Sequence, residues 1–419
     1  MELKQGYKQT EVGVIPEDWN VKSLGELGEF KNGINKSAED FGFGSPFVNL
    51  MDVFGKYEIN NNTSLDLINS NSFEKKTYNL KKGDVLFIRS SVKPSGVGLT
   101  ALIKEDIIDT VYSGFLIRFR EKSYLEDSYK KYCFYSERFR LELIANSTVS
   151  ANTNINQEAL KKLKIGFPTN KPEQTAIANA LSDMDALISQ TEKLIEKKKA
   201  IKQGAMQELL KPKEGWVNCT LGDIINLIAD YTANGSFESL KNNVKYYSDS
   251  NYAVLVRTTD LDKNKFVPER FTDKLGYDFL SKTSLSGGEI VIANVGSLGK
   301  VFRVPHFEMP MTLAPNTYLL KFSNTIDENF IFYWLNTKEF YQKLMSKIGS
   351  TTLQAINKDN LRSIELSVPN NIEDQIKISK ILTDIDSERK IIENKLTKLK
   401  QQKQGMMQAL LTGKIRLVS

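Results

Sequence analysis

The stretch KQGAMQELL at residues 202–210 returns as KQGMMQALL at residues 403–411, a displacement of 201 residues. Between Ile155 and Leu210, about a third of the positions are identical to the residues 201 positions later, where chance would give roughly one in seventeen. The chain is therefore a tandem duplication. Other positions related by the same displacement include Tyr132 and Tyr333, Asn156 and Asn357, Asp185 and Asp386, and Glu192 and Glu393.

The sequence ahead of these matching tails is similar only in short islands, and the displacement there changes. Trp19 with the following Leu24-Gly25-Glu26 corresponds to Trp216 with Leu221-Gly222-Asp223, which lie 197 residues later. A drifting displacement indicates loops of unequal length. Each half therefore consists of a divergent body of about 170 residues and a similar tail of about 40 residues. Such a pair of copies indicates two related but non-identical recognition tasks.

The two tails are predicted to form long helices. Their apolar residues recur in alternating steps of four and three, which is the pattern of a coiled-coil seam. A helix of about 38 residues spans roughly 57 Å, too long to pack on one small domain. We therefore expect the helices to pair antiparallel and to separate the two bodies about a pseudo-two-fold axis. The predicted seam residues are Ile177, Leu181, Met184, Ile188 and Ile195 in the first tail and Ile378, Leu382, Ile385, Ile392, Leu396 and Leu399 in the second.

The two bodies are predicted to mix strands and helices. Residues 85–88 and 290–293 are short apolar runs after a Gly-containing turn, which indicates buried strands. Residues 128–144 and 328–348 are predicted to be helices. The expected fold class is therefore α+β, with two mixed α/β bodies and a pair of long helices. Because residues 411–417 occupy the place that leads from the first tail into the second body, we expect the chain end to lie near the beginning of the first body.

Length and composition exclude several classes of protein. The 419 residues exceed what one hydrophobic core usually organises, so at least two domains are expected. The 57 Lys and Arg against 51 Asp and Glu give a net charge of +6, which permits a nucleic-acid partner without requiring one. Apolar runs stay far below the roughly 20 residues that cross a bilayer, and the amino terminus has no signal-peptide pattern. A cytoplasmic protein is expected.

The chain has only two cysteines and one histidine, and this small number limits the catalytic and metal-binding chemistry that it can perform. Cys133, Cys219 and His306 are too far apart in the sequence to form a zinc site at the usual short spacing. No Pro-Pro pair of a methyltransferase motif occurs. The Gly-rich segment 296–301 differs from an ATPase phosphate loop in spacing and in its last residue, Val301. We expect no catalytic, cofactor-binding or metal-binding residue in this chain.

The order of these features resembles the specificity subunit of type I restriction-modification systems. The resemblance rests on two variable bodies with similar long helices, on the openings at residues 13–19 and 215–223, and on the helix ends at residues 204–207 and 405–408. It covers essentially the whole chain. It implies that each body is a target recognition domain that reads one half of a bipartite, asymmetric site in double-stranded DNA. The helices would set the gap between the halves and dock two modification (methyltransferase) subunits.

The resemblance also implies partners that carry the chemistry. Restriction subunits with translocase and nuclease activity would join the complex, and S-adenosylmethionine, ATP and Mg²⁺ would be bound by the partner subunits, none of them by this chain. The predicted domains are target recognition domain 1 at 1–171, a central helix at 172–211, target recognition domain 2 at 212–372, a C-terminal helix at 373–412 and a tail at 413–419.

Base reading requires polar side chains such as Arg, Lys, Asn, Ser or Thr on loops or at strand ends. Three kinds of segment meet this requirement: the turns after the two buried strands, the residues ahead of Asp52 and Asp260, and the polar loops before the tails. A plain surface turn is the alternative reading of each segment. The DNA-binding candidates are Asn49, Arg89, Ser90, Ser91, Lys93, Arg257, Thr258, Thr259, Asn294, Ser297, Lys300, Ser350 and Thr351.

Two other functions stay open at this level. One is a coiled-coil scaffold whose bodies bind protein partners, and failure to bind DNA in the presence of the modification subunit would favour it. The other is a fused DNA methyltransferase or nuclease with unfamiliar motifs, which would methylate or cut DNA as the purified chain alone.

Overall fold

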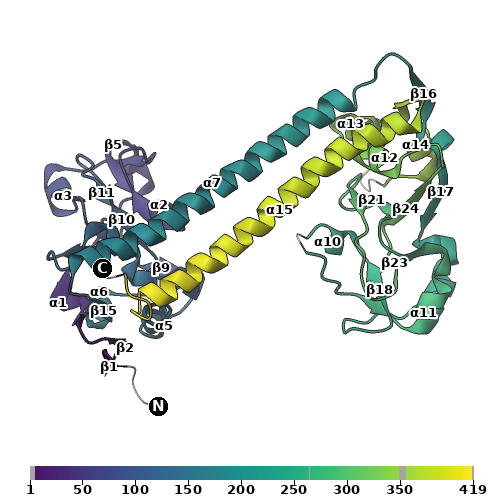
Figure 1. Cartoon of the computed structure of the whole chain (residues 1–419). Coiled ribbons are helices and arrows are strands. Elements are labelled where there is room, and N and C mark those ends of the chain that lie inside the picture. Colours follow the sequence, from purple (N-terminus) through teal and green to yellow (C-terminus); the bar gives the residue numbers. More distant parts are fainter. Residues whose placement is uncertain (1–4, 264, 349–354, 418–419) are drawn as a thin grey trace. The chain divides into compact units, whose positions relative to one another are not determined.

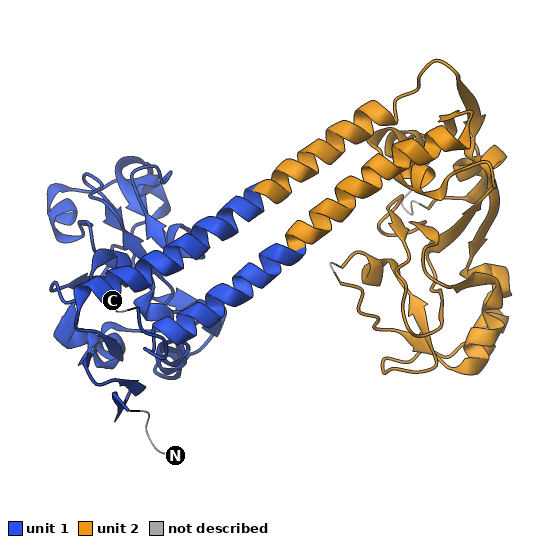
Figure 2. Ribbon diagram, viewed as in Figure 1, with its two compact units in different colours: residues 1–193, 394–419 blue, residues 194–393 orange. Residues whose placement is uncertain are grey.

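The structure is a computed structural model that describes residues 5–263, 265–348 and 355–417. It divides into two compact units (Figure 2): unit 1 contains residues 1–193 and 394–419, and unit 2 contains residues 194–393. Each unit holds one of the two bodies. Two helices of 39 residues, α7 (Lys171–Leu209) and α15 (Ile372–Leu410), are labelled in Figure 1, and Figure 2 shows that each contributes a segment to both units. The domain boundaries given above stay predictions, because this division cuts through both helices.

Unit 1 contains a five-stranded sheet whose neighbouring strands are antiparallel, apart from one parallel pair at its edge. In order, this sheet consists of β4 (Gly28–Asn32), β12 (Leu116–Glu121), β8 (Val85–Ile88), β10 (Thr100–Ile103) and β6 (Glu58–Ile59). The smaller sheets are β11 (Val111–Tyr112), β5 (Phe41–Val48) and β7 (Asp66–Ile68); β13 (Thr148–Val149), β14 (Thr153–Asn154) and β9 (Ser90–Ser91); β1 (Tyr7–Thr10) and β2 (Gly13–Pro16); and β15 (Lys164–Pro168) and β3 (Trp19–Ser23). Its short helices are α1 (Leu24–Leu27), α2 (Leu50–Val53), α3 (Ser72–Thr77), α4 (Asp127–Lys130), α5 (Glu137–Ala145) and α6 (Gln157–Lys162).

Unit 2 contains two four-stranded sheets and a two-stranded one. The first is β17 (Ile225–Asp230), β24 (Thr317–Phe322), β21 (Ile290–Ala293) and β22 (Val301–Arg303); the second is β19 (Phe271–Thr272), β18 (Ala253–Val256), β23 (Met311–Leu313) and β20 (Ser284–Leu285); the third is β16 (Trp216–Thr220) and β25 (Glu365–Pro369). Its short helices are α8 (Leu221–Ile224), α9 (Phe237–Asn243), α10 (Thr258–Leu261), α11 (Lys274–Phe279), α12 (Glu328–Leu335), α13 (Lys338–Lys347) and α14 (Lys358–Arg362). The mixture of strands and helices in both units confirms the predicted α+β class.

The central sheets of the two units share one strand order. The antiparallel strands β4-β12-β8-β10 of unit 1 correspond to β17-β24-β21-β22 of unit 2. The two-stranded sheets also match, because Trp19 lies opposite Pro168 and Trp216 lies opposite Pro369. The duplication therefore extends through the bodies, where sequence identity has nearly disappeared.

A buried glutamine lies in the first turn of each long helix. The Gln174 Nε2 donates to the carbonyl of Pro168 at 2.8 Å, and its Oε1 accepts from the backbone N–H of Glu126 at 2.7 Å. Gln375 makes the two equivalent bonds in unit 2, at 3.0 and 2.9 Å. The start of each helix is thereby tied to the last strand and to a helical segment of its own body.

Within each unit the segments of α7 and α15 run antiparallel. The cross-helix ion pairs are Asp185–Lys403 and Glu192–Lys400 in unit 1, and Lys198–Glu388 and Lys202–Asp386 in unit 2. In each unit the residue number rises along one helix as it falls along the other, as antiparallel packing requires. Every one of the eleven predicted seam residues is buried or half-buried. In unit 1, Ile177 of α7 and Leu410 of α15 also pack into the body core with Trp19.

One prediction about the bodies was wrong in detail. Residues 128–144 and 328–348 do not form single helices, because each stretch is interrupted before α5 and α13. Ser136 and Thr337 have extended backbones there, and their side-chain oxygens accept from the N–H groups of Phe139 and Phe340. Such N-cap bonds start a new helix. Among the described residues, no helix is both long and apolar enough to cross a membrane.

Residues 413–416, which follow α15, lie against the beginning of the first body, as predicted for this segment. Within unit 1, the hydroxyl of Tyr7 donates to the carbonyl of Gly413 at 2.9 Å. The Arg416 guanidinium bonds the buried carboxylate of Glu173 at 2.5 and 2.8 Å and that of Asp18 at 2.8 and 2.9 Å. The hydrogen bond from Arg416 holds the pKa of Asp18 below its ordinary value. We call these contacts of residues 413–416 the tail clasp.

Breaking the tail clasp should destabilise unit 1. Arg416→Met leaves the buried Glu173 carboxylate without its cation, so we expect the free energy of unfolding to fall by about 3 kcal/mol in urea titrations. Lys414→Met, at an exposed neighbouring position, is the matched control and should have little effect. Adding Glu173→Gln to Arg416→Met should recover part of the loss. Equal stability of the Arg416 and Lys414 variants would contradict this account.

Candidate nucleic-acid interface

The loop after strand β8 in unit 1 begins at Arg89. Its backbone N–H donates to the carbonyl of Phe115 at 2.8 Å, and its carbonyl accepts from the N–H of Ile155 at 2.9 Å. The N–H of Gly98 closes the loop on the carbonyl of Ile88 at 2.7 Å. The half-buried Arg89 is thereby held at the end of a buried strand.

Asn294 occupies the same place after strand β21 of unit 2. Its N–H donates to the carbonyl of Asn316 at 3.1 Å, and its carbonyl accepts from the N–H of Ile356 at 3.0 Å. The N–H of Gly299 closes this loop on the carbonyl of Ala293 at 2.9 Å. The backbone hydrogen bonds therefore make Arg89 and Asn294 equivalent, although these residues are not separated by the constant displacement of the repeat.

The two loops differ in length, which explains why Arg89 and Asn294 are not separated by the constant displacement of 201 residues. The first loop spans residues 89–97 and the second spans residues 294–298. In unit 1 the longer loop includes β9, which pairs with β14, and β14 pairs with β13. The structure thus brings Ser90 and Ser91 together with the polar loop 147–154, another segment that the sequence predicted to touch DNA.

A glycine fixes each loop against a helix of its body. Gly98 and Gly299 have positive φ angles of +65° and +77°. A Cβ atom on Gly98 would lie 2.4 Å from a methyl carbon of Leu143 in α5, and one on Gly299 would lie 2.8 Å from a methyl carbon of Leu344 in α13. Both the backbone conformation and the close approach therefore require glycine.

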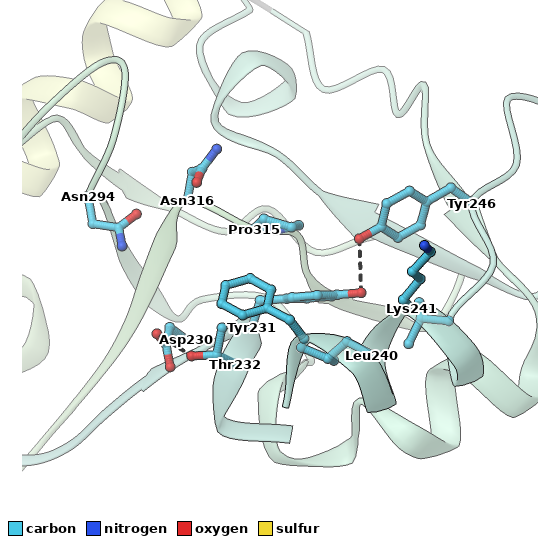
Figure 3. Close-up of a pocket in the computed structure, with 11 residues that line it drawn as sticks. Asp230, Tyr231, Thr232, Leu240, Lys241, Tyr246, Asn294, Pro315 and Asn316 are labelled. Carbon is cyan, nitrogen blue, oxygen red and sulfur yellow. Dashed lines mark hydrogen bonds between the residues drawn. The ribbon is translucent and has the colours of Figure 1, made fainter. Parts of the chain in front are cut away.

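Asn294 also lines a pocket of about 590 Å³ in unit 2 (Figure 3). In the close-up, Asn294 and Asn316 lie on one side of this pocket and Lys241 and Tyr246 on the other. The Tyr246 hydroxyl donates to that of Tyr231 at 2.9 Å, and burial raises the pKa of Tyr231. Amide side chains and aromatic rings in one concave surface are groups that contact the edges and faces of nucleobases.

The second pair of candidates, Asn49 and Arg257, occupies equivalent positions at the starts of α2 and α10. The Asn49 side chain accepts from the N–H of Leu50 at 2.8 Å. The Arg257 guanidinium donates to the fully buried Asp260 at 2.6 Å and to Glu269 at 2.9 Å, and its hydrogen bond to the Asp260 carboxylate is the main cause of its raised pKa. Because a base contact would have to break these ion pairs, Arg257 is a weaker candidate than Arg89.

Four of the remaining candidates are exposed: Lys93, Thr259, Ser297 and Lys300, of which Lys300 forms an ion pair with Asp262. Thr258 is half-buried at the start of α10. Ser350 and Thr351 lie outside the described residues. The structure therefore gathers candidates around each buried strand end, at Arg89 to Ser91 in unit 1 and at Asn294 to Lys300 in unit 2. The sequence did not identify Asn316, Tyr231 or Tyr246 as neighbours of Asn294, since their segments are far apart along the chain.

Neither cysteine thiol has the lowered pKa that a nucleophilic thiol needs. Burial raises the pKa of both thiols, Cys133 and Cys219, so each rests protonated at neutral pH. His306 lies exposed on a loop with its Nδ1 3.2 Å from the carbonyl of Ser286. Within the described ranges, His, Cys, Asp and Glu side chains form no cluster of three that could hold a metal ion.

Two segments of the chain, residues 16–203 and 213–401, match the family described as the type I restriction modification DNA specificity domain. The chain is 26% identical, over 99% of its length and 97% of the relative's, to a putative type I restriction enzyme MjaX specificity subunit from Methanocaldococcus jannaschii. The type I restriction enzyme MjaVIII specificity subunit of the same organism is 23% identical with the same coverage.

Two solved structures share the fold at low sequence identity. The S subunit of a type I restriction-modification system from M. genitalium has a TM-score of 0.53 at 17% identity, with 98% of each chain covered. A chain from a study of complex assembly and conformational transition of the type I R-M system has a TM-score of 0.62 at 14% identity, covering 96% of this chain and 99% of that one.

Replacing the loop glycine should test how the strand-end loops are held. Gly299→Ala combines a strained backbone with a clash against Leu344, so we expect the free energy of unfolding to fall by about 2 kcal/mol in urea titrations. Gly296→Ala has a similar positive φ but open space around its Cβ, so only the smaller conformational strain of about 1 kcal/mol should remain. Equal losses in both variants would show that the contact with α13 does not matter.

Proposed function

Because the chain belongs to the family of type I restriction modification DNA specificity domains and carries two copies of that domain, we propose that each body binds one half of a split site in double-stranded DNA. The protein is a specificity subunit with two recognition domains. In this proposal each body reads a short run of base pairs in the major groove. The subunit would act in the cytoplasm.

The observation that carries the proposal is the equivalence of Arg89 and Asn294. The two positions have the same backbone hydrogen bonds at the end of a buried strand, yet one carries a guanidinium and the other an amide. Arginine pairs with the O6 and N7 acceptors of guanine, whereas asparagine pairs with the N6 donor and N7 acceptor of adenine. One scaffold with two different readers is what an asymmetric split site requires.

Neighbouring groups support the same assignment. In unit 1, Ser90 and Ser91 lie beside the hairpin of β13 and β14, whose short polar side chains suit base edges and phosphates. In unit 2, the pocket beside Asn294 offers the amide of Asn316 and the ammonium group of Lys241. Exposed Lys93 and Ser297 are suited to phosphate contacts.

The covalent chemistry is proposed to belong to partner subunits. Two modification subunits, which bind S-adenosylmethionine, would dock on α7 and α15, and restriction subunits that use ATP and Mg²⁺ would join them. This chain would then need no cofactor and would not be catalytic. Its net charge of +6 suits such a division, because the partners can supply much of the phosphate neutralisation that DNA binding requires.

Exchanging one body should change one half of the site. We expect a chimera that carries residues 213–371 of a related subunit, produced with the modification subunits, to methylate a motif with one half altered and the other retained. Sequencing of modified bases in the genome of the producing cells measures this. A motif altered in both halves, or in neither, would contradict the modular assignment.

Single substitutions at the two equivalent positions should act on opposite half-sites. Asn294→Ala should relax base choice in the half-site of the second body, and Arg89→Ala in that of the first, each by roughly 5- to 100-fold at one base pair. The same genome-wide reading of modified bases gives both results. Lys93→Ala is the matched control, since a phosphate contact weakens binding without changing the motif. Relaxation of both halves by one substitution would contradict the assignment.

A further inference from the structure

A tyrosine, an aspartate and a lysine from three different segments meet in unit 1. The Tyr132 hydroxyl, from the body, donates to Asp185 Oδ2 of α7 at 2.6 Å and lies 3.0 Å from Ser182 Oγ. The other oxygen of Asp185 pairs with Lys403 Nζ of α15 at 2.6 Å. The ammonium group also lies 3.9 Å from the ring centre of Tyr57. The body, helix α7 and helix α15 of unit 1 are thus joined at one point.

The same three residue types meet in unit 2, with the roles of the helices exchanged. The Tyr333 hydroxyl, from α12, donates to Asp386 Oδ2 of α15 at 2.9 Å and to Thr383 Oγ1 at 3.3 Å. Lys202 Nζ of α7 donates to the same oxygen of Asp386 at 2.7 Å and lies 5.1 Å from the centre of the Tyr333 ring. We call each set, Tyr132–Asp185–Lys403 and Tyr333–Asp386–Lys202, a triad.

Burial makes the pairing of each triad lysine with its aspartate specific. Lys403 is only 7% exposed, and Lys202 and both aspartates are half-buried. Burial and the nearby charge of Asp386 raise the pKa of Tyr333 to about 12, and burial and the hydrogen bond to Asp185 raise the pKa of Tyr132. Both hydroxyls therefore stay protonated donors at neutral pH. A partly buried lysine that loses its aspartate is left with an uncompensated charge, so a shifted pairing of the helices is strongly disfavoured.

The exposed cross-helix ion pairs behave differently from the triads. Glu192 pairs with Lys400 in unit 1, but Lys199, the counterpart of Lys400, bonds Glu196 of its own helix in unit 2. Exposed pairs contribute little to stability and can rearrange. The triads keep the same three residue types and the same pairing of tyrosine and lysine with aspartate in both units, although the bodies around them have diverged.

An apolar seam alone leaves the register of two helices weakly defined, because Ile and Leu side chains fit neighbouring positions almost equally well. A single buried polar group is the usual way in which a coiled coil selects one register. One base pair of B-DNA spans about 3.4 Å, which is little more than the rise of two helical residues. A shift of one helical turn would therefore change a distance along DNA by more than one base pair.

We propose that the two triads are positioning groups that fix the register of α7 against α15 and thereby set the number of base pairs between the two half-sites. This inference rests on the proposed function, since a gap exists only if the bodies read two halves of one DNA site. Within each triad the tyrosine orients the body, and the aspartate joins the body to one long helix. The lysine, which lies on the other long helix, selects the register between the two helices.

The test measures preference for the gap separately from affinity. The complete complex of this chain with its modification subunits is tested on duplexes that carry the wild-type motif, as read from modified bases in the producing cells. The duplexes are identical except for gaps one base pair shorter or longer. We expect Lys202→Met to reduce the ratio of modification at the native gap to that at the altered gaps by about tenfold. The base sequence of each half-site should not change.

Matched variants separate a positioning role from a general loss of stability. Lys400→Met removes an exposed cross-helix pair and should leave the ratio unchanged. Lys202→Arg keeps the cation and should retain the preference, and the exchange of charges in Lys202→Asp with Asp386→Lys should restore much of it. Lys202→Met variants that lose modification equally at every gap would overturn the proposal. A wild-type complex that modifies no split motif would instead overturn the proposed function itself.

Discussion

An apolar stripe that runs along a helix of 39 residues has to be covered, and one small body reaches only part of it. In unit 1 the first turns of α7 are covered by the body core, where Ile177 packs beside Trp19. Farther along, seam residues such as Ile188 are half-buried, and the ion pair of Glu192 with Lys400 joins α7 to α15. The antiparallel pairing of two equivalent helices is therefore the constraint on which the arrangement of each unit depends, and the duplication of the chain supplies the partner.

This constraint leaves the bodies free to differ. The buried strands that carry Arg89 and Asn294 keep their place in equivalent sheets, and Gly98 and Gly299 hold the loops behind them. Between those fixed points the loops have different lengths, 89–97 against 294–298, and different side chains. Recognition can therefore change in the loops without disturbing either the cores or the helices.

Much of this arrangement could be predicted from the repeat. The helical tails and their seam followed from the apolar spacing that recurs in both copies, and the position of residues 413–416 followed from the equivalent place of the segments after the two tails. The breaks at Ser136 and Thr337 were missed, since apolar spacing continues through a break that only a side-chain cap creates. The contact of Asp185 with Lys403 was also beyond prediction. Both were visible as repeated positions, but helical periodicity does not define which residues meet across an antiparallel pair.

The tail clasp has a consequence for the order in which the protein forms during synthesis. Unit 2 is a continuous stretch of chain, residues 194–393, whereas unit 1 combines residues 1–193 with the last 26 residues, 394–419. Leu410, Leu411 and Arg416 complete the core and the charge balance around Trp19 and Glu173. The body that the ribosome makes first thus lacks part of its interior until the segment after residue 393 has been made, and loss of Leu410, Leu411 and Arg416 would damage the half of the protein that is synthesised first.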